Sequence, residues 1–276
     1  MMGVSALQRA RFFGSLEKPM QRWTRQTPFT DPGNSSPALA AIGGSPESAV
    51  EAIQGLLIHG EAVEHYGLNP DAFSRETLPV GLRLSAILAD DDRPLGSPRP
   101  PQSRALVTCR DYAVLLCAAM RQRGRPSRVR CGFASYLGGA PWEDHWLCEL
   151  WSGDRWQRMD GQLDPVLRDA LGTEFPSVDV PADAFLTADQ AWIACRSGRH
   201  DPAAFGHGEA RGLWFAYVNL ARDRLALDDL MTSEWDEWRV IASDPPNLTD
   251  AMLAAADELA LAGADAKVPG GPPWRS

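Results

Sequence analysis

Three residues in the middle of the chain, Cys109, His145 and Asp160, have the side-chain types that catalysis by a thiol nucleophile requires. A thiolate attacks a carbonyl carbon, an imidazole carries the proton, and a carboxylate keeps the imidazole in orientation. The three can act together only if the elements that carry them bring them into contact. The segments around each residue therefore decide the interpretation.

Cys109 stands at the expected start of a buried helix. Thr108 is a suitable cap, and Asp111 lies in the first turn, where negative charge suits the helix dipole. Residues 112–120 are apolar on nearly every face, and Gly124 is a typical helix end. A thiolate at such an N-terminus is stabilised, and the backbone N–H groups there can hydrogen-bond an oxyanion.

His145 and Asp160 belong to expected strands. Residues 128–137 alternate between apolar and polar side chains, which is typical of a half-buried strand. Residues 145–151 and 155–160 read as two further strands joined by a turn at 152–154.

The turn decides how the last two strands are paired. A two-residue Ser152–Gly153 loop, the register that we predict, sets His145 directly opposite Asp160 with Cβ atoms roughly 5 Å apart. A Gly153–Asp154 loop would make them diagonal neighbours, and only a loop of odd length would send them to opposite faces. Both two-residue loops bring a carboxylate beside an imidazole.

Taken together, these motifs resemble the transglutaminase-like superfamily, whose papain-type core packs a cysteine-bearing helix on strands bearing histidine and aspartate. The resemblance is carried by Cys109-Arg-Asp-Tyr-Ala, Gly124-Arg-Pro-Ser-Arg-Val, Asp144-His145-Trp146 and Trp156-Gln-Arg-Met-Asp160. It is closer still to bacterial transglutaminase-like proteins of unestablished role, through the runs 54–59, 91–95, 160–164 and 219–223.

The resemblance implies a role for each triad residue: Cys109 is the nucleophile, His145 the general base and acid, and Asp160 the group that orients His145. It implies no cofactor, and the cysteine spacing does not resemble a metal site. Further residues are candidates for substrate binding or for support of the triad: His59, Arg110, Asp111, Trp142, Asp144, Trp146 and Gln162. Four more cysteines are interpreted as inert core residues: Cys117, Cys131, Cys148 and Cys195.

The predicted fold class is α+β, with a buried helix on an antiparallel sheet and helices on both flanks. We expect an irregular arm at 1–45, a single domain at 46–265 with its core at 105–165 and helical flanks at 46–90 and 185–262, and a frayed tail at 266–276. Helices are expected near 45–67, which contains His59, and near 75–89, 187–195, 212–223 and 249–262.

Composition narrows the class of protein. With 27 basic against 36 acidic residues the formal net charge is −9, which argues against a nucleic-acid partner. We interpret the locally basic stretch 121–130 as solvated faces of folded elements. The longest uncharged apolar run, 113–120, is too short to cross a bilayer. Five widely spaced cysteines suit a reducing compartment, so a cytoplasmic protein without a membrane partner is expected.

Two classes of function remain open. The first is an enzyme that acts on a small-molecule or peptide amide through a thioester, either as a hydrolase (protease or amidase) or as an acyltransferase of the transglutaminase type. The second is a non-catalytic binding or scaffold protein that retains the fold. The presence of all three triad residue types favours the enzyme. Oligomeric state is not indicated by the sequence.

Overall fold

The computed structural model describes residues 20–69, 73–231 and 247–264 of the chain. Within these ranges the structure is an assembly of helices and strands of the expected α+β class, which is confirmed. Residues 1–19 of the expected arm and the expected tail at 266–276 lie outside the described residues.

A six-stranded sheet occupies the centre, with β6–β3–β4–β7–β8 in order and β5 also paired with β4. The two long central strands are antiparallel, and the pairing of β7 with β4 is parallel. The bounds are β3 (Ser127–Ala134), β4 (Trp142–Trp151), β5 (Trp156–Met159), β6 (Phe185–Thr187), β7 (Phe205–His207) and β8 (Ala210–Arg211).

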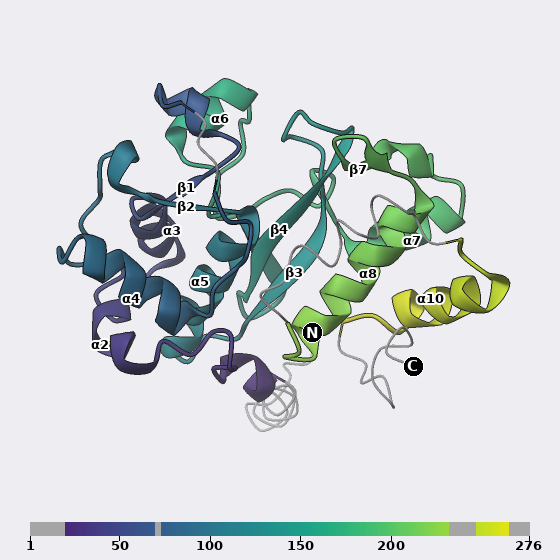
Figure 1. The fold of residues 1–276 in the computed structure, drawn as a ribbon. Helices are drawn as coiled ribbons and strands as arrows, with labels where there is room; N and C mark the ends of the chain where they lie inside the picture. Colours follow the sequence, from purple (N-terminus) through teal and green to yellow (C-terminus); the bar gives the residue numbers. More distant parts are fainter. Residues whose placement is uncertain (1–19, 70–72, 232–246, 265–276) are drawn as a thin grey trace, which may run out of the picture.

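Helices cover both faces of this sheet (Figure 1). On one face lies α5 (Cys109–Gln122), with the N-terminal elements packed behind it: α2 (Ser36–Leu39), α3 (Pro46–Gln54) and α4 (Val80–Asp90). On the other face lie α7 (Ala188–Arg196), α8 (Leu213–Leu227) and α10 (Asp250–Ala262), close to the expected helices in that half. The short α6 (Pro165–Leu171) follows the end of β5.

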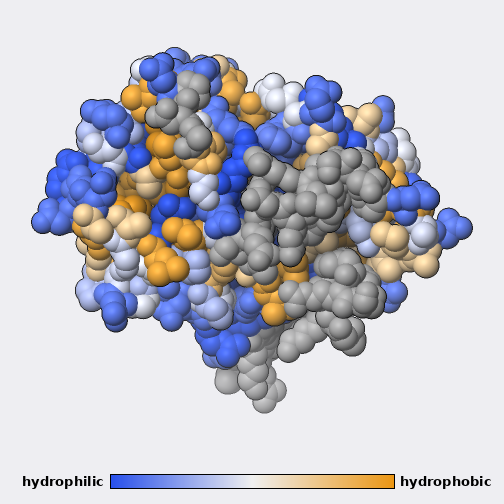
Figure 2. All heavy atoms as spheres, in the orientation of Figure 1, coloured by the Kyte–Doolittle hydropathy of each residue, from blue (hydrophilic) through white to orange (hydrophobic). Residues whose placement is uncertain are grey.

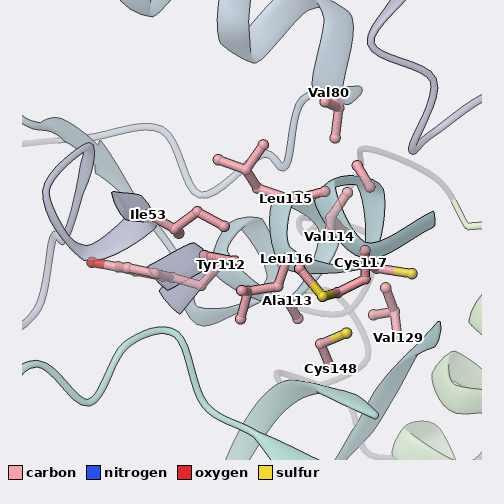
Figure 3. Close-up of a cluster of buried hydrophobic side chains, with 14 of the residues drawn as sticks. Ile53, Val80, Tyr112, Ala113, Val114, Leu115, Leu116, Cys117, Val129 and Cys148 are labelled. Atoms are coloured by element: carbon pink, nitrogen blue, oxygen red, sulfur yellow. The ribbon is translucent and has the colours of Figure 1, made fainter. Parts of the chain in front are cut away.

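The larger core forms around α5. Its side chains from Tyr112 to Cys117 contact neighbours on several sides, among them Ile53 of α3, Val129 of β3 and Cys148 of β4 (Figure 3). Every residue of α5 from Cys109 to Arg121 is buried. The predicted buried helix is therefore confirmed, and the rigid core around it fixes the position of its first residue.

Two expectations about β3 are wrong, for one reason. Its eight residues are all buried, whereas the alternating pattern predicted a half-buried strand. In the stretch 121–130, Arg121 of α5 and Arg128 and Arg130 of β3 are likewise buried, at 5%, 5% and 3% exposure, whereas Arg123 and Arg125 are partly exposed. The cause is that α5 and α8 pack on opposite faces of this strand, so no face of it is left to water.

The expected helix at 45–67 is also wrong in its second half. The Ser45 cap starts α3 as predicted, but the helix ends at Gln54. Gly55 follows at a close contact, where a Cβ atom would come within 2.9 Å of the Cα of Pro98. The apolar run after it forms β1 (Leu57–His59), which pairs in parallel with β2 (Ala105–Val107). His59 is therefore on a strand and not on a helix.

The β4–β5 hairpin uses the second of the two possible registers. Trp151 pairs with Trp156 and Cys148 with Met159, and the N–H of Ser152 donates to the carbonyl oxygen of Arg155 at 3.0 Å. The turn is thus Gly153–Asp154, and the predicted Ser152–Gly153 turn is wrong. Gly153 has φ +109°, which a glycine adopts without strain, so it is the natural first residue of this turn.

On the face seen in Figure 2, hydrophilic residues cover most of the described surface and hydrophobic ones form smaller patches between them. None of the helices in the described ranges is both long enough and apolar enough to cross a membrane.

Candidate active site

The start of α5 is held firmly in place. The N–H of Thr108 donates to Oδ2 of Asp111 at 3.2 Å, and Arg83 of α4 forms an ion pair with the same carboxylate at 2.9 Å. Cys109, the first residue of the helix, has 7% of its surface exposed and lines a cleft. Asp111, a candidate site residue, therefore fixes the helix end that presents Cys109.

His145 lies in β4 and Asp160 immediately after β5, and the two side chains are in contact. Nε2 of His145 lies 2.8 Å from Oδ2 of Asp160, and both side chains are 1% exposed. Two more hydrogen bonds hold the carboxylate: the Tyr136 hydroxyl donates to Oδ2 at 2.6 Å, and the N–H of Gln162 donates to Oδ1 at 2.9 Å. The diagonal register thus still brings the imidazole and the carboxylate together.

The electrostatics of this pair favour charge on both partners. Burial by itself acts to raise the pKa of Asp160, but the charge of His145 and the hydrogen bonds lower it overall. Burial likewise acts to lower the pKa of His145, but Asp160 and the Cys109 side chain raise it to about 10. An imidazole of this kind holds a proton near neutral pH and can balance a thiolate.

The second ring nitrogen of His145, Nδ1, is not engaged by Asp160. Nδ1 has no hydrogen-bond partner among the residues that the structure describes, although it is buried. The Cys109 side chain is among the groups that raise the pKa of the ring. The imidazole is thus held by Asp160 through one nitrogen and leaves the other for the thiol or for a substrate.

Cys109 and His145 share a cleft of about 310 Å³, which is at the lower end of the range for small-ligand sites. One part of its lining is apolar: Ala62, Phe73, Leu137, Leu167 and Leu171. Another part is polar: His59, Glu61, Arg75, Glu143 and His207.

Salt bridges hold the polar part of the lining together. Glu61 pairs with Arg75, and Glu143 pairs with Nδ1 of His207. Nε2 of His207 lies 3.8 Å from Glu61, which links the two pairs. The carboxylates on this wall are therefore partly neutralised before any ligand binds.

The other candidate residues divide into two groups. His59, Asp144 and Gln162 line the cleft, whereas the remaining candidates, Arg110, Asp111, Trp142 and Trp146, are not part of its lining. Of the first group, Asp144 is already engaged, because it accepts hydrogen bonds from Asn219 at 2.8 Å and Arg222 at 3.0 Å.

The second group lies outside the cleft lining and supports the elements that carry the site residues. Arg110 is buried, donates to the Thr77 hydroxyl at 2.7 Å and lies 5.6 Å from the ring centre of Trp146. Trp142 stacks on Phe205 of β7 with ring centroids 5.8 Å apart. These residues brace β4 and the start of α5. The four additional cysteines are buried and free, which fits their interpretation as core residues.

Several residues at the site were not expected from the sequence. His207 reaches the cleft because β7 pairs with β4, so that Gly206 is the partner of Glu143. Tyr136 comes from the segment after β3 and holds Asp160. The position of Glu143, two residues before His145, was the one usable signal in the sequence for this group. His207 has no such local signal, because it reaches the cleft through a strand that is distant in the sequence.

No metal centre is formed by the part of the chain that the structure describes: nowhere in it do three or more His, Cys, Asp or Glu side chains gather in a way that could hold an ion. The cleft presents a thiol and an imidazole, and the imidazole is held from behind the lining by the Asp160 carboxylate.

Comparison with known proteins matches one segment of the chain to a family model. Residues 102–161, which include the Cys109, His145 and Asp160 positions, match the transglutaminase-like superfamily. No curated protein matches the sequence. A solved structure of a candidate cysteine protease from Cytophaga hutchinsonii is similar at 19% identity over 56% of this chain, with a TM-score of 0.22. The match spans 46% of that protein, and a TM-score this low lends no weight to the assignment.

Proposed function

We propose that this chain, which carries a transglutaminase-like domain over residues 102–161, is a cysteine-dependent hydrolase. It cleaves an amide or peptide bond through a thioester. In this proposal Cys109 is the nucleophile, His145 the general base and acid, and Asp160 the residue that orients His145. The observation that carries the proposal is the environment of the two ring nitrogens of His145. Nε2 lies 2.8 Å from Asp160, whereas Nδ1 has no hydrogen-bond partner among the described residues, and the ring lines the same cleft as Cys109.

The reaction begins when the Cys109 thiolate attacks the carbonyl carbon and an Sγ–C bond forms. The carbonyl π electrons move to oxygen, where N–H groups at the start of α5 can stabilise the negative charge. As the C–N bond breaks, the proton on Nδ1 of His145 passes to the leaving nitrogen. The amine departs and a thioester remains on Cys109.

Water then completes the cycle. His145, now neutral, takes a proton from the water, whose oxygen attacks the thioester carbon. The second tetrahedral intermediate releases the acid and restores the thiolate–imidazolium pair. Asp160 does not exchange protons in these steps; its role is to keep the ring oriented and to stabilise its positive charge.

The test uses p-nitrophenyl acetate, an activated acyl donor that needs no knowledge of the natural substrate. We expect a burst of nitrophenolate with one acetyl group on Cys109, located by mass spectrometry of the peptides. In His145→Ala the burst rate should fall by about 100-fold or more, since the loss of general base catalysis has about that effect. Acetylation confined to other residues, or equal rates in both proteins, would overturn the proposal.

The same thioester separates hydrolysis from acyl transfer. If water is the acceptor, steady turnover should be insensitive to added primary amines such as putrescine or glycine amide. If an amine is the acceptor, turnover should rise with amine concentration and an acetylated amine should accumulate. That result would keep Cys109 as the nucleophile and reassign the enzyme as an acyltransferase.

A further inference from the structure

His59 stands close to Cys109 for a topological reason. It is the last residue of β1, and its partner in the parallel pairing with β2 is Val107, two residues before Cys109. The short step from β2 into α5 therefore sets His59 beside the start of the helix. Both residues line the same cleft, together with His145.

The hydrogen bonds of His59 determine which ring nitrogen carries its proton. The backbone N–H of Glu61 donates to Nδ1 at 3.2 Å, so Nδ1 is the acceptor and the proton of the neutral ring is on Nε2. Among the residues that the structure describes, no hydrogen bond to Nε2 is formed. Nε2–H is thus a donor available to a group bound in the cleft.

The ring is also neutral under ordinary conditions. Burial lowers the pKa of His59 to about 4; the charge of Glu61 opposes this shift, and the nearby charges of His145 and Arg75 add to it. A second imidazolium beside protonated His145 would be repelled. A neutral imidazole avoids this repulsion and still donates a hydrogen bond, a role that enzymes give to neutral histidines.

We infer that His59 is a further catalytic residue, whose Nε2–H donates a hydrogen bond to the oxyanion formed when Cys109 attacks a carbonyl. The inference rests on the proposed thiol chemistry. As the Sγ–C bond forms, the electron pair moves to oxygen, which accepts from His59 and from the N–H groups at the start of α5. When the intermediate collapses the pair returns, the leaving group departs, and His59 keeps its proton throughout.

One side chain in the lining and one outside it serve as comparisons. Gln162 also has an amide that can donate, and its Oε1 is buried without a hydrogen-bond partner. His200 is an exposed histidine that does not line the cleft. His200→Leu is therefore a matched control for His59→Leu.

The experiment compares two reactions of the same thiol. Alkylation by iodoacetamide displaces iodide and forms no oxyanion, so its rate reports only the activated thiolate. Acylation by p-nitrophenyl acetate passes through a tetrahedral oxyanion, so its rate also reports the donors around it. The ratio of acylation rate to alkylation rate at Cys109 isolates the contribution of an oxyanion donor.

In His59→Leu the acylation rate should fall by about 10²- to 10³-fold, which is the scale of one lost oxyanion donor. The alkylation rate should stay within about threefold of wild type because the Cys109–His145 pair is intact. His59→Gln, which has an amide N–H near the position of Nε2, should recover a large part of the acylation rate. His200→Leu should leave both rates as in wild type.

Other outcomes overturn the inference. Equal loss of both rates in His59→Leu would mean that the residue only maintains the structure, and His59→Gln would then show the same equal loss. A ratio unchanged in His59→Leu but reduced in Gln162→Leu would move the donor to Gln162. If wild-type Cys109 reacts with neither reagent, the thiol chemistry itself fails; if it reacts with both and His59→Leu matches it, only the role of His59 fails.

Discussion

Two of the ionic clusters buried on the central strands β3 and β4 differ in which hydrogen-bonding groups they leave unpaired. In the first, Arg130 of β3 donates from all three guanidinium nitrogens to carboxylates, those of Asp223, Glu149 and Asp189. In the second, His145 of β4 meets Asp160 through Nε2 and leaves Nδ1 without a hydrogen-bond partner among the described residues.

We propose that this difference separates a structural ion cluster from a reactive one. In the Arg130 cluster every guanidinium nitrogen donates to a carboxylate of the protein, and α8 covers the cluster through Asp223. The His145 cluster retains one nitrogen at a cleft that also contains a thiol. Burial and charge are common to both clusters. A ring nitrogen without a hydrogen-bond partner next to a cavity is therefore the feature that indicates a catalytic site.

The largest expected effect is that of Cys109→Ala. The substitution removes the proposed nucleophile but little volume, so the acetyl-enzyme burst should disappear while the thermal midpoint shifts by only a few degrees. Burst kinetics measure the loss of acylation, and a thermal melt measures the change in the thermal midpoint. A burst that persists would show that the reactive cluster has another nucleophile.

Asp160→Asn should make the reactive cluster resemble an ordinary buried histidine. Without the carboxylate charge, the pKa of His145 falls and the imidazolium no longer balances a thiolate. We expect the acylation rate to drop by about 10²- to 10⁴-fold. Tyr136→Phe removes only one hydrogen bond to the same carboxylate and should cost far less. Similar losses in both variants would contradict the electrostatic explanation.

Arg130→Met tests the structural cluster. It leaves Asp223 buried without its cation, which typically costs about 3–5 kcal/mol in the free energy of unfolding, whereas Glu149 keeps its ion pair with Arg128. The alkylation rate of Cys109 in the folded protein should be unchanged. Arg155→Met, which breaks an exposed pair with Asp179, is the control and should change stability much less. Urea unfolding at neutral pH measures both.

The two clusters should respond to opposite ends of the pH range. The pKa of His145 is raised to about 10, so its contribution to stability is present below about 6.5 and is lost as the pH rises through 10. Burial acts to raise the pKa of Glu149, but Arg130 and Arg128 lower it to about 2. Its contribution is present above about 4.5 and is lost as the pH falls toward 2.

Urea unfolding across pH can separate these contributions. The stability difference between wild type and His145→Gln should shrink from pH 6.5 to pH 10, whereas that between wild type and Glu149→Gln should shrink from pH 4.5 downward. A His145→Gln difference that grows toward alkaline pH would contradict the assigned direction of its pKa.

The parts predictable from the sequence were those set by local patterns. The continuous apolar run after Cys109 could only be a buried helix, and the period of two in a strand placed His145 and Asp160 on one face in either two-residue register. The choice of turn was not decided locally, because Ser152–Gly153 and Gly153–Asp154 both suit a tight hairpin.

What could not be predicted depends on partners far away in the sequence. Arg130 reads as a surface residue until Asp223, 93 positions later, is known to pair with it. His59 reads as helical because its strand is formed by pairing with residues 105–107. The same holds for His207, which joins the cleft only through the pairing of β7 with β4.

The most direct test of the central claim uses two cysteines of equal exposure in one molecule. Cys109 and Cys195 are each 7% exposed, and burial raises the pKa of the Cys195 thiol to about 11. With limiting iodoacetamide at about pH 6, we expect alkylation of Cys109 to exceed that of Cys195 by about 100-fold or more, because only a thiolate reacts at that pH. In His145→Ala the excess should disappear. Equal labelling of the two cysteines in the wild-type protein would contradict an activated Cys109–His145–Asp160 triad.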